Sequence, residues 1–147
     1  MKTSRLPKDV FKAACKFKLL NNTIHYKSLK ITDGVSSDIW YVKTDQNIEF
    51  CIKRALAKLT VKEDWYAPIS RNNFEAMYFR YCHKMAPNNF PRLLGHDNKN
   101  FILAMEWYTP NDFLVWKKKL LNKKIEKKDI INVSDLLIKK HKKFLKK

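Results

Sequence analysis

A lysine and a glutamate lie in two segments of different character. The lysine could bind an anion such as a phosphate, and the glutamate could hold the lysine in place. Lys53 ends the run Phe50-Cys51-Ile52-Lys53, which is typical of a buried strand, and Glu75 follows 22 residues later in a helical pattern. An ammonium group in a buried strand is costly unless a carboxylate or an anion meets it. Glu75 could reach the sheet from such a helix and meet Lys53, and an exposed side chain is the alternative at each position.

A loop of small residues precedes this strand and could contact phosphate oxygens through its main chain. The segment Asp33-Gly34-Val35-Ser36-Ser37-Asp38 contains one of only two glycines in the chain and two adjacent serines. Glycine permits conformations in which successive N–H groups converge on an anion. The candidate phosphate contacts are Gly34, Ser36 and Ser37, but an ordinary hairpin turn would have the same composition.

Five strands that could position these residues are predicted from runs of β-branched and aromatic residues between turn-forming residues. They cover residues 26–31, 38–42, 48–55, 90–95 and 101–107. The turns between the first three are short, so these strands are expected to form an antiparallel meander. The predicted fold class is α+β, with a five-stranded antiparallel sheet and one packed helix, followed by two helices.

Four helices are predicted from apolar residues at helical spacing. They cover residues 8–20, 71–85, 112–121 and 129–144. Ser70 could cap the second helix. The apolar stripe of that helix is expected to bury against the sheet, and it consists of Phe74, Met77, Tyr78, Tyr81 and Met85. We expect a missing segment or a partner protein to cover the stripe of the last helix, which consists of Ile130, Val133, Leu137 and Phe144.

The charge of the chain raises the question of nucleic-acid binding, because the formal net charge is +17 in 147 residues. Residues 117–147 contain thirteen lysines against three acidic residues, so this segment carries +10 of that charge. It contains no arginine, the side chain that binds phosphates and bases bidentately. A solvated, lysine-rich helical surface is therefore the favoured interpretation, and nucleic acid is the less favoured partner.

The cysteines and the apolar runs indicate a reduced protein without a membrane span. Cys15, Cys51 and Cys82 form no C-x-x-C pair, so we expect no disulfide and no metal site. The longest apolar run, residues 101–105, is far too short to span a bilayer, and lysines interrupt residues 1–20. A cytoplasmic location is the resulting expectation.

The order of these elements resembles the amino-terminal lobe of protein kinases, in which a glycine-containing hairpin, a strand lysine and a helix glutamate surround the nucleotide phosphates. Over about residues 27–141, the sequence resembles the aminoglycoside-phosphotransferase-like kinases. The motifs that carry this resemblance are Asp33-Gly34-Val35-Ser36-Ser37-Asp38, Phe50-Cys51-Ile52-Lys53, Ser70-Arg71-Asn72-Asn73-Phe74-Glu75, Phe90-Pro91-Arg92-Leu93-Leu94-Gly95-His96-Asp97 and Leu103-Ala104-Met105-Glu106-Trp107-Tyr108.

The resemblance implies an ATP site at these motifs. In such a site Met105 lines the back of the adenine pocket, and main-chain groups of Glu106 and Tyr108 hydrogen-bond the base. The complete set of nucleotide-binding residues that it implies is Gly34, Ser36, Ser37, Lys53, Glu75, Met105, Glu106 and Tyr108. It also implies a nucleotide-binding lobe over residues 1–106, with a helical extension at 1–25, and the hinge and first helices of an incomplete carboxy-terminal lobe over 107–147.

The sequence departs from the family after the last predicted helix. The family's H-x-D pattern followed by asparagine, and its later metal-binding aspartate, have no counterpart, since no acidic residue follows Asp135. His96-Asp97 lacks the intervening residue and is interpreted as a structural turn. No catalytic or metal-binding residue is therefore assigned, and Mg²⁺ is expected only with a complete carboxy-terminal lobe.

The implied function is the nucleotide-binding portion of an ATP-dependent phosphotransferase that acts on a small hydroxyl or amino-alcohol substrate. We expect the chain to be inactive by itself, because phosphoryl transfer also requires a base and metal ligands. The alternatives are a non-catalytic binding or regulatory module that docks on a partner and, less favoured, a basic nucleic-acid-binding protein.

Overall fold

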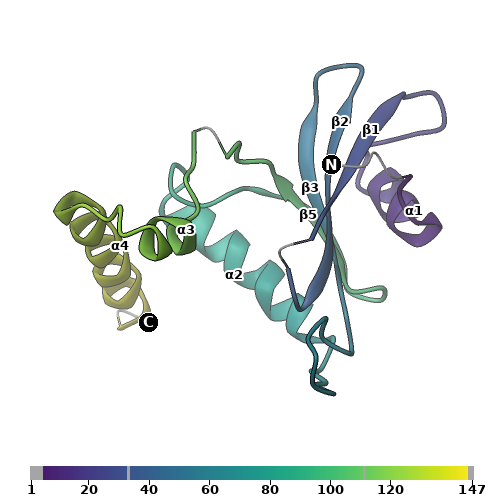
Figure 1. Cartoon of the computed structure of the whole chain (residues 1–147). Coiled ribbons are helices and arrows are strands. Elements are labelled where there is room, and N and C mark those ends of the chain that lie inside the picture. The colour runs from purple at the N-terminus through teal and green to yellow at the C-terminus, as the bar shows by residue number, and fades with distance from the viewer. Residues whose placement is uncertain (1–4, 33, 111, 146–147) are drawn as a thin grey trace. The chain divides into compact units, whose positions relative to one another are not determined.

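The computed structural model of the chain describes residues 5–32, 34–110 and 112–145, with side chains to residue 142. These residues form an α+β structure with nine elements (Figure 1). The chain divides into two compact units, Met1–Trp107 and Tyr108–Lys147, and each is described by itself. The first unit contains the sheet and two helices, and the second contains two further helices.

The sheet has five antiparallel strands, as the sequence predicted, in the order β1-β2-β3-β5-β4. The strands are β1 (Tyr26–Ile31), β2 (Ser37–Thr44), β3 (Glu49–Ala55), β4 (Leu93–Asp97) and β5 (Ile102–Glu106). β4 begins three residues later than predicted, after Pro91, because proline cannot donate to a strand ladder. The register then slips between Leu93 and Gly95, where the pairing with β5 is irregular.

Helix α1 (Lys8–Lys16) covers one face of the sheet, a role that the sequence had not assigned to the amino-terminal extension. Figure 1 shows this helix beside the sheet. It ends four residues earlier than predicted, and Lys18 just beyond it adopts a left-handed conformation with φ 60°. The helix and the sheet share one apolar core, whose buried members are Leu6, Val10, Ala13, Ala14, Leu20, Trp40, Val42, Phe50, Ile52, Ile102 and Ala104.

Helix α2 (Arg71–Met85) lies against the opposite face, which carries the odd-numbered residues of β3. The sequence predicted the wrong side of this helix, since Phe74 and Met77 are exposed at 71% and 62% and Tyr78 is also exposed. The buried residues of α2 are instead Asn72, Ala76 and Cys82, whose short side chains permit a close approach to the strands. Ser70 is also not the predicted cap, because its side chain makes no capping hydrogen bond.

The second unit contains α3 (Trp116–Leu121) and α4 (Lys127–Leu145). α3 begins four residues later than predicted, because Thr109 and Asp112 form a turn through a 2.5 Å hydrogen bond between their side chains. Asn111, which fell within the predicted hinge, lies outside the described residues. Lys119 Nζ and Asp129 Oδ2 form an ion pair of 2.5 Å between the two helices.

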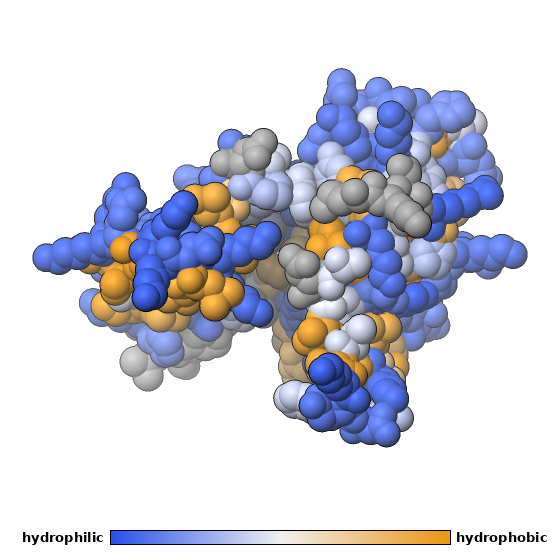
Figure 2. Space-filling view, in the orientation of Figure 1, coloured by the Kyte–Doolittle hydropathy of each residue, from blue (hydrophilic) through white to orange (hydrophobic). Residues whose placement is uncertain are grey.

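Apolar side chains of the second unit remain at its surface, and no described residue of the unit is buried. Figure 2 shows hydrophobic patches among the hydrophilic side chains of α3 and α4. Of the predicted stripe, Ile130, Val133 and Leu137 are all exposed, and the side chain of Phe144 lies outside the described part. Among the described residues, none of the helices combines the length and apolar character needed to cross a membrane.

Candidate functional site

The predicted ion pair between Lys53 and Glu75 is present in the structure. β3 presents Lys53 on the face that meets α2, and Lys53 Nζ lies 2.5 Å from Glu75 Oε1. The Lys53 side chain is 14% exposed and the Glu75 side chain 33% exposed, so the pair lies at the edge of the helix–sheet interface. An ammonium has three N–H donors, and the carboxylate occupies one of them. A second anion could therefore approach the same ammonium from the exposed side.

Apolar residues of neighbouring strands flank the lysine on the same face of the sheet. Ile39 of β2 and Leu103 of β5 stand directly opposite Lys53, and Tyr41 and Met105 stand opposite Cys51. Paired residues of antiparallel strands share a face, so these side chains form one row next to the ammonium group. This surface, defined by Ile39, Tyr41, Cys51 and Met105, is called the apolar row below. It could bind a flat, uncharged ring beside a charged group.

Trp107 extends the apolar row at the end of the first unit. Its ring lies 4.7 Å from the ring of Tyr41, measured between centroids, and the two planes are tilted by 44°. Tyr41 and Met105 are only partly buried, whereas Leu103 is fully buried. This face of the sheet is thus buried around Leu103 and partly accessible around Tyr41 and Met105.

Cys51 is the one thiol in the apolar row. Burial raises the pKa of its thiol to about 12, with an opposing contribution from the nearby Lys53 ammonium. Since the thiolate is the reactive form, Cys51 remains a neutral packing residue at physiological pH. The thiol contributes an apolar surface to the row and no nucleophile.

Gly34 and Ser36 lie in the loop that connects β1 and β2, at the end of the sheet where β3 also ends, and Ser37 is the first residue of β2. The Val35 carbonyl accepts a 2.8 Å hydrogen bond from Thr60 N, and the Ser36 carbonyl accepts one of 3.1 Å from Leu56 N. Gly34 does not have a positive φ; a Cβ atom there would lie 3.0 Å from Ile39 Cδ1. Ser37 is buried, and Asp33 lies outside the described residues.

These hydrogen bonds orient the peptide groups of the loop. The described residues contain no cis peptide, and in a trans peptide the C=O and the following N–H point in opposite directions. The N–H group of Ser36 is therefore directed away from Thr60, and that of Ser37 away from Leu56. Both N–H groups are thus directed away from the segment that follows β3, and an anion placed there could accept hydrogen bonds from them.

The remaining predicted residues lie at the end of β5. Met105 belongs to the apolar row, while the Glu106 side chain lies on the other face and forms an ion pair with Arg92, with 3.1 Å between Nε and Oε1. The Glu106 N–H donates to the Arg92 carbonyl, so only the carbonyl of Glu106 could bind a base. Tyr108 is the first residue of the second unit, and its ring stacks on Phe113 at 4.3 Å.

Arg71 is a residue of this region to which the sequence interpretation assigned no role. Its guanidinium group donates to main-chain carbonyls of the β1–β2 loop, of the residue after β3 and of the segment before α2. Its partners are dispersed along the chain, and no local pattern marks them in the sequence. Only its position at the first turn of the helix that carries Glu75 could have drawn attention to it.

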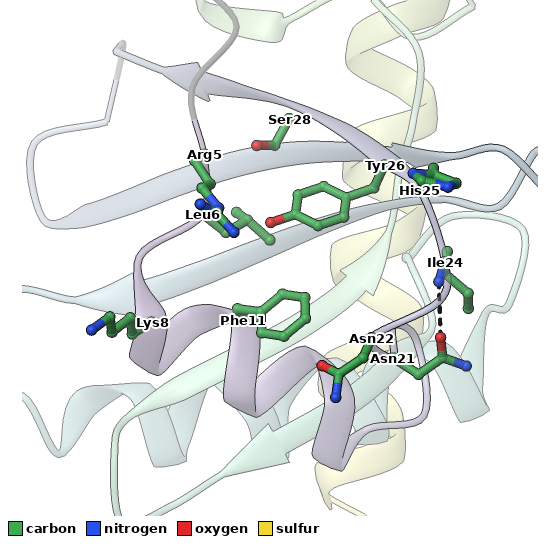
Figure 3. A pocket seen from close by; sticks show the side chains of 10 residues that line it. All are labelled: Arg5, Leu6, Lys8, Phe11, Asn21, Asn22, Ile24, His25, Tyr26 and Ser28. Carbon is green, nitrogen blue, oxygen red and sulfur yellow. Dashed lines mark hydrogen bonds between the residues drawn. The ribbon is translucent and has the colours of Figure 1, made fainter.

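A separate cavity of about 690 Å³ lies between α1 and the start of β1 (Figure 3). Arg5, Lys8 and His25 supply its basic groups, and its lining contains no carboxylate. The rings of Phe11 and Tyr26 stack in its wall at 6.0 Å. None of the predicted nucleotide-binding residues lines it, so this hollow is distinct from the site around Lys53.

The other classes of site give no stronger candidate. In residues 5–32, 34–110 and 112–145, no group of three or more histidine, cysteine or acidic side chains is placed to hold a metal ion. No protein-family model and no curated protein matches the chain. The Lys53–Glu75 pair with its apolar row is therefore the candidate functional site, and its residues alone carry the functional argument.

Proposed function

We propose that this chain is the nucleotide-binding portion of an ATP-dependent phosphotransferase, similar to the aminoglycoside-phosphotransferase-like kinases and acting on a small hydroxyl or amino-alcohol substrate. The observation that carries this proposal is the 2.5 Å ion pair between Lys53 on the third strand and Glu75 on the following helix. Lys53 belongs to a five-stranded antiparallel sheet, and Glu75 belongs to the helix that lies between the third and fourth strands in the sequence. This is the arrangement expected of a kinase-like amino-terminal lobe.

Each part of ATP has a matching surface in this proposal. The ammonium of Lys53 binds phosphate oxygens while Glu75 fixes its position, and the N–H groups of Ser36 and Ser37 bind further phosphate oxygens. The adenine ring packs on the apolar row, with the main-chain carbonyl of Glu106 at its edge. The proposal assigns ATP binding to these residues, and it assigns neither a Mg²⁺ site nor a catalytic base to any of them.

The test is ATP·Mg²⁺ affinity of the wild type compared with Lys53→Ala, measured by calorimetry. Removing the phosphate-binding ammonium should weaken binding by about tenfold or more, since hydrogen bonds to charged groups contribute about 1.5–3 kcal/mol. Lys16→Ala is the matched control, because Lys16 lies on α1, which covers the other face of the sheet, and pairs with Asp97 at 3.2 Å. Equal affinity of the wild type and Lys53→Ala would remove the proposed role of Lys53.

The exposed apolar side chains of α4 support a second candidate, a binding or regulatory module. Ile130, Val133 and Leu137 are 54%, 41% and 48% exposed on a helix of 19 residues. Exposed patches of this kind usually mark an interface. In this case the second unit docks on another protein. Analytical ultracentrifugation tests this candidate. A chain that stays monomeric at high concentration would count against an exposed apolar interface on α4.

A further inference from the structure

The guanidinium group of Arg71 joins three separate segments of the first unit. Its Nη2 donates to the Ser36 carbonyl at 2.5 Å and to the Leu56 carbonyl at 2.7 Å. Its Nη1 donates to the carbonyls of Pro68 at 2.8 Å and Ala67 at 3.0 Å. One side chain therefore connects the β1–β2 loop, the end of β3 and the start of α2.

Only an arginine can make this set of contacts. A guanidinium group presents several N–H donors in a fixed plane, whereas a lysine ammonium is a compact point charge with three rotatable donors. The four acceptors of Arg71 among the described residues are neutral carbonyls, so these contacts are charge-assisted hydrogen bonds. The arrangement is selective for the geometry of the side chain as well as for its charge.

The contact to Ser36 determines how the loop presents its N–H groups. The Ser36 carbonyl accepts from both Leu56 N and Arg71 Nη2, so two donors hold the Ser36–Ser37 peptide in one orientation. The N–H of Ser37 is fixed on the opposite side of the same peptide. Loss of the guanidinium contact would leave the bond from Leu56 N as the described hydrogen bond to this carbonyl, so the peptide would resist rotation less.

We propose that Arg71 is a positioning residue that holds the β1–β2 loop in its phosphate-binding conformation and connects the loop to the helix that carries Glu75. This inference rests on the proposed function, in which the loop binds the phosphates of ATP. Arg71 touches no nucleotide in this role. It aligns the two phosphate-binding parts, the loop and the Lys53–Glu75 pair, because it contacts the loop and starts the helix.

The experiment compares wild type, Arg71→Lys and the control Arg80→Lys for binding of ATP and of adenosine. Arg80 is exposed on the same helix, so its replacement controls for the loss of an arginine from α2. Arg71→Lys should raise the Kd for ATP by about tenfold, equivalent to about 1.4 kcal/mol, and leave the Kd for adenosine within about twofold. Amide hydrogen exchange without nucleotide should be faster at residues 34–37 and unchanged in the middle of β2.

The outcomes separate this inference from the proposed function. Equal weakening of ATP and adenosine, or unchanged affinity for both, would show that Arg71 has no role specific to phosphate and would overturn the inference while the nucleotide site stands. A wild type that binds neither ligand would overturn the proposed function itself. Hydrogen exchange would then decide separately whether Arg71 orders the loop.

Discussion

Lys53 and Glu75 provide a stability test that does not depend on any ligand. Because the pair is partly buried, Glu75→Gln leaves an ammonium without its counter-charge and should destabilise the fold by about 1–3 kcal/mol, between the values for exposed and fully buried pairs. The double variant Lys53→Met/Glu75→Leu should recover most of this loss, because both charges are removed together. Urea unfolding compares the two variants with the wild type. A Glu75→Gln midpoint equal to that of wild type would show that the pair contributes nothing.

The lowered pKa of Asp97 predicts that the stability of the fold depends on pH. Burial opposes ionisation, but hydrogen bonds from Asn100 and then from Lys16 and Lys99 lower the pKa of the Asp97 carboxyl from 3.8 to about 2. A carboxyl group with a lowered pKa stabilises the fold above pH 4, and this contribution of about 2 kcal/mol is lost as the pH falls from about 4 to 2. Asp97→Asn should therefore be less stable at pH 7, and its unfolding free energy should change less between pH 4 and 2 than that of wild type. Parallel curves for the two proteins would contradict the assignment.

At the level of the elements, the strands could be predicted and the packing of the helices could not. The composition of residues 50–53 alone predicts a buried strand. The pairing of Lys53 with Glu75 was expected because the order of the elements resembles a kinase-like lobe. The prediction of which side of α2 is buried was wrong, because its largest apolar residues, such as Phe74, point away from the sheet while Asn72 faces it. Periodicity identifies the two sides of a helix, but it does not show which side meets the strands.

The same limit applies to α1 and to Arg71. The amphipathic pattern of residues 8–20 predicted a helix, but nothing local indicates that it completes the core with Phe50 and Ile52. Arg71 contacts Ser36 across 35 residues of sequence, and such long-range contacts have no local signature. Element types are therefore readable from the sequence, whereas contacts between distant elements come only from the fold.

The contact between β4 and the segment after α1 predicts a strong packing effect at Gly95. A Cβ atom at this position would lie 2.1 Å from Cγ of the Phe17 ring, so the ring has to move if an alanine is present. Gly95→Ala should cost about 1–3 kcal/mol of stability, as over-packing does, and Gly95→Ala/Phe17→Leu should recover part of it. Gly34→Ala is the control, because its Cβ would meet the flexible end of Ile39 at 3.0 Å. Similar urea midpoints for both single variants would contradict this packing argument.

For the whole molecule, the buried core and most of the net charge lie in different parts of the chain. The buried apolar core lies between Leu6 and Ala104, entirely within the first unit. The last 31 residues carry +10 of the net charge and expose apolar side chains such as Leu121, at 73%. A unit in which no described residue is buried adds little hydrophobic stabilisation of its own, because that stabilisation scales with the apolar area removed from water.

This division predicts that residues 1–107 fold without the second unit. The fragment should keep the far-ultraviolet circular dichroism of the sheet and a cooperative thermal transition, since it retains the whole core. It should also bind less of the dye ANS than the full chain, which exposes the apolar side chains of α3 and α4. Leu120→Lys/Leu137→Lys in the full chain is the matched control and should lower dye binding without loss of the fold. An unfolded fragment, or dye binding equal to that of the full chain, would show that the second unit is part of the core.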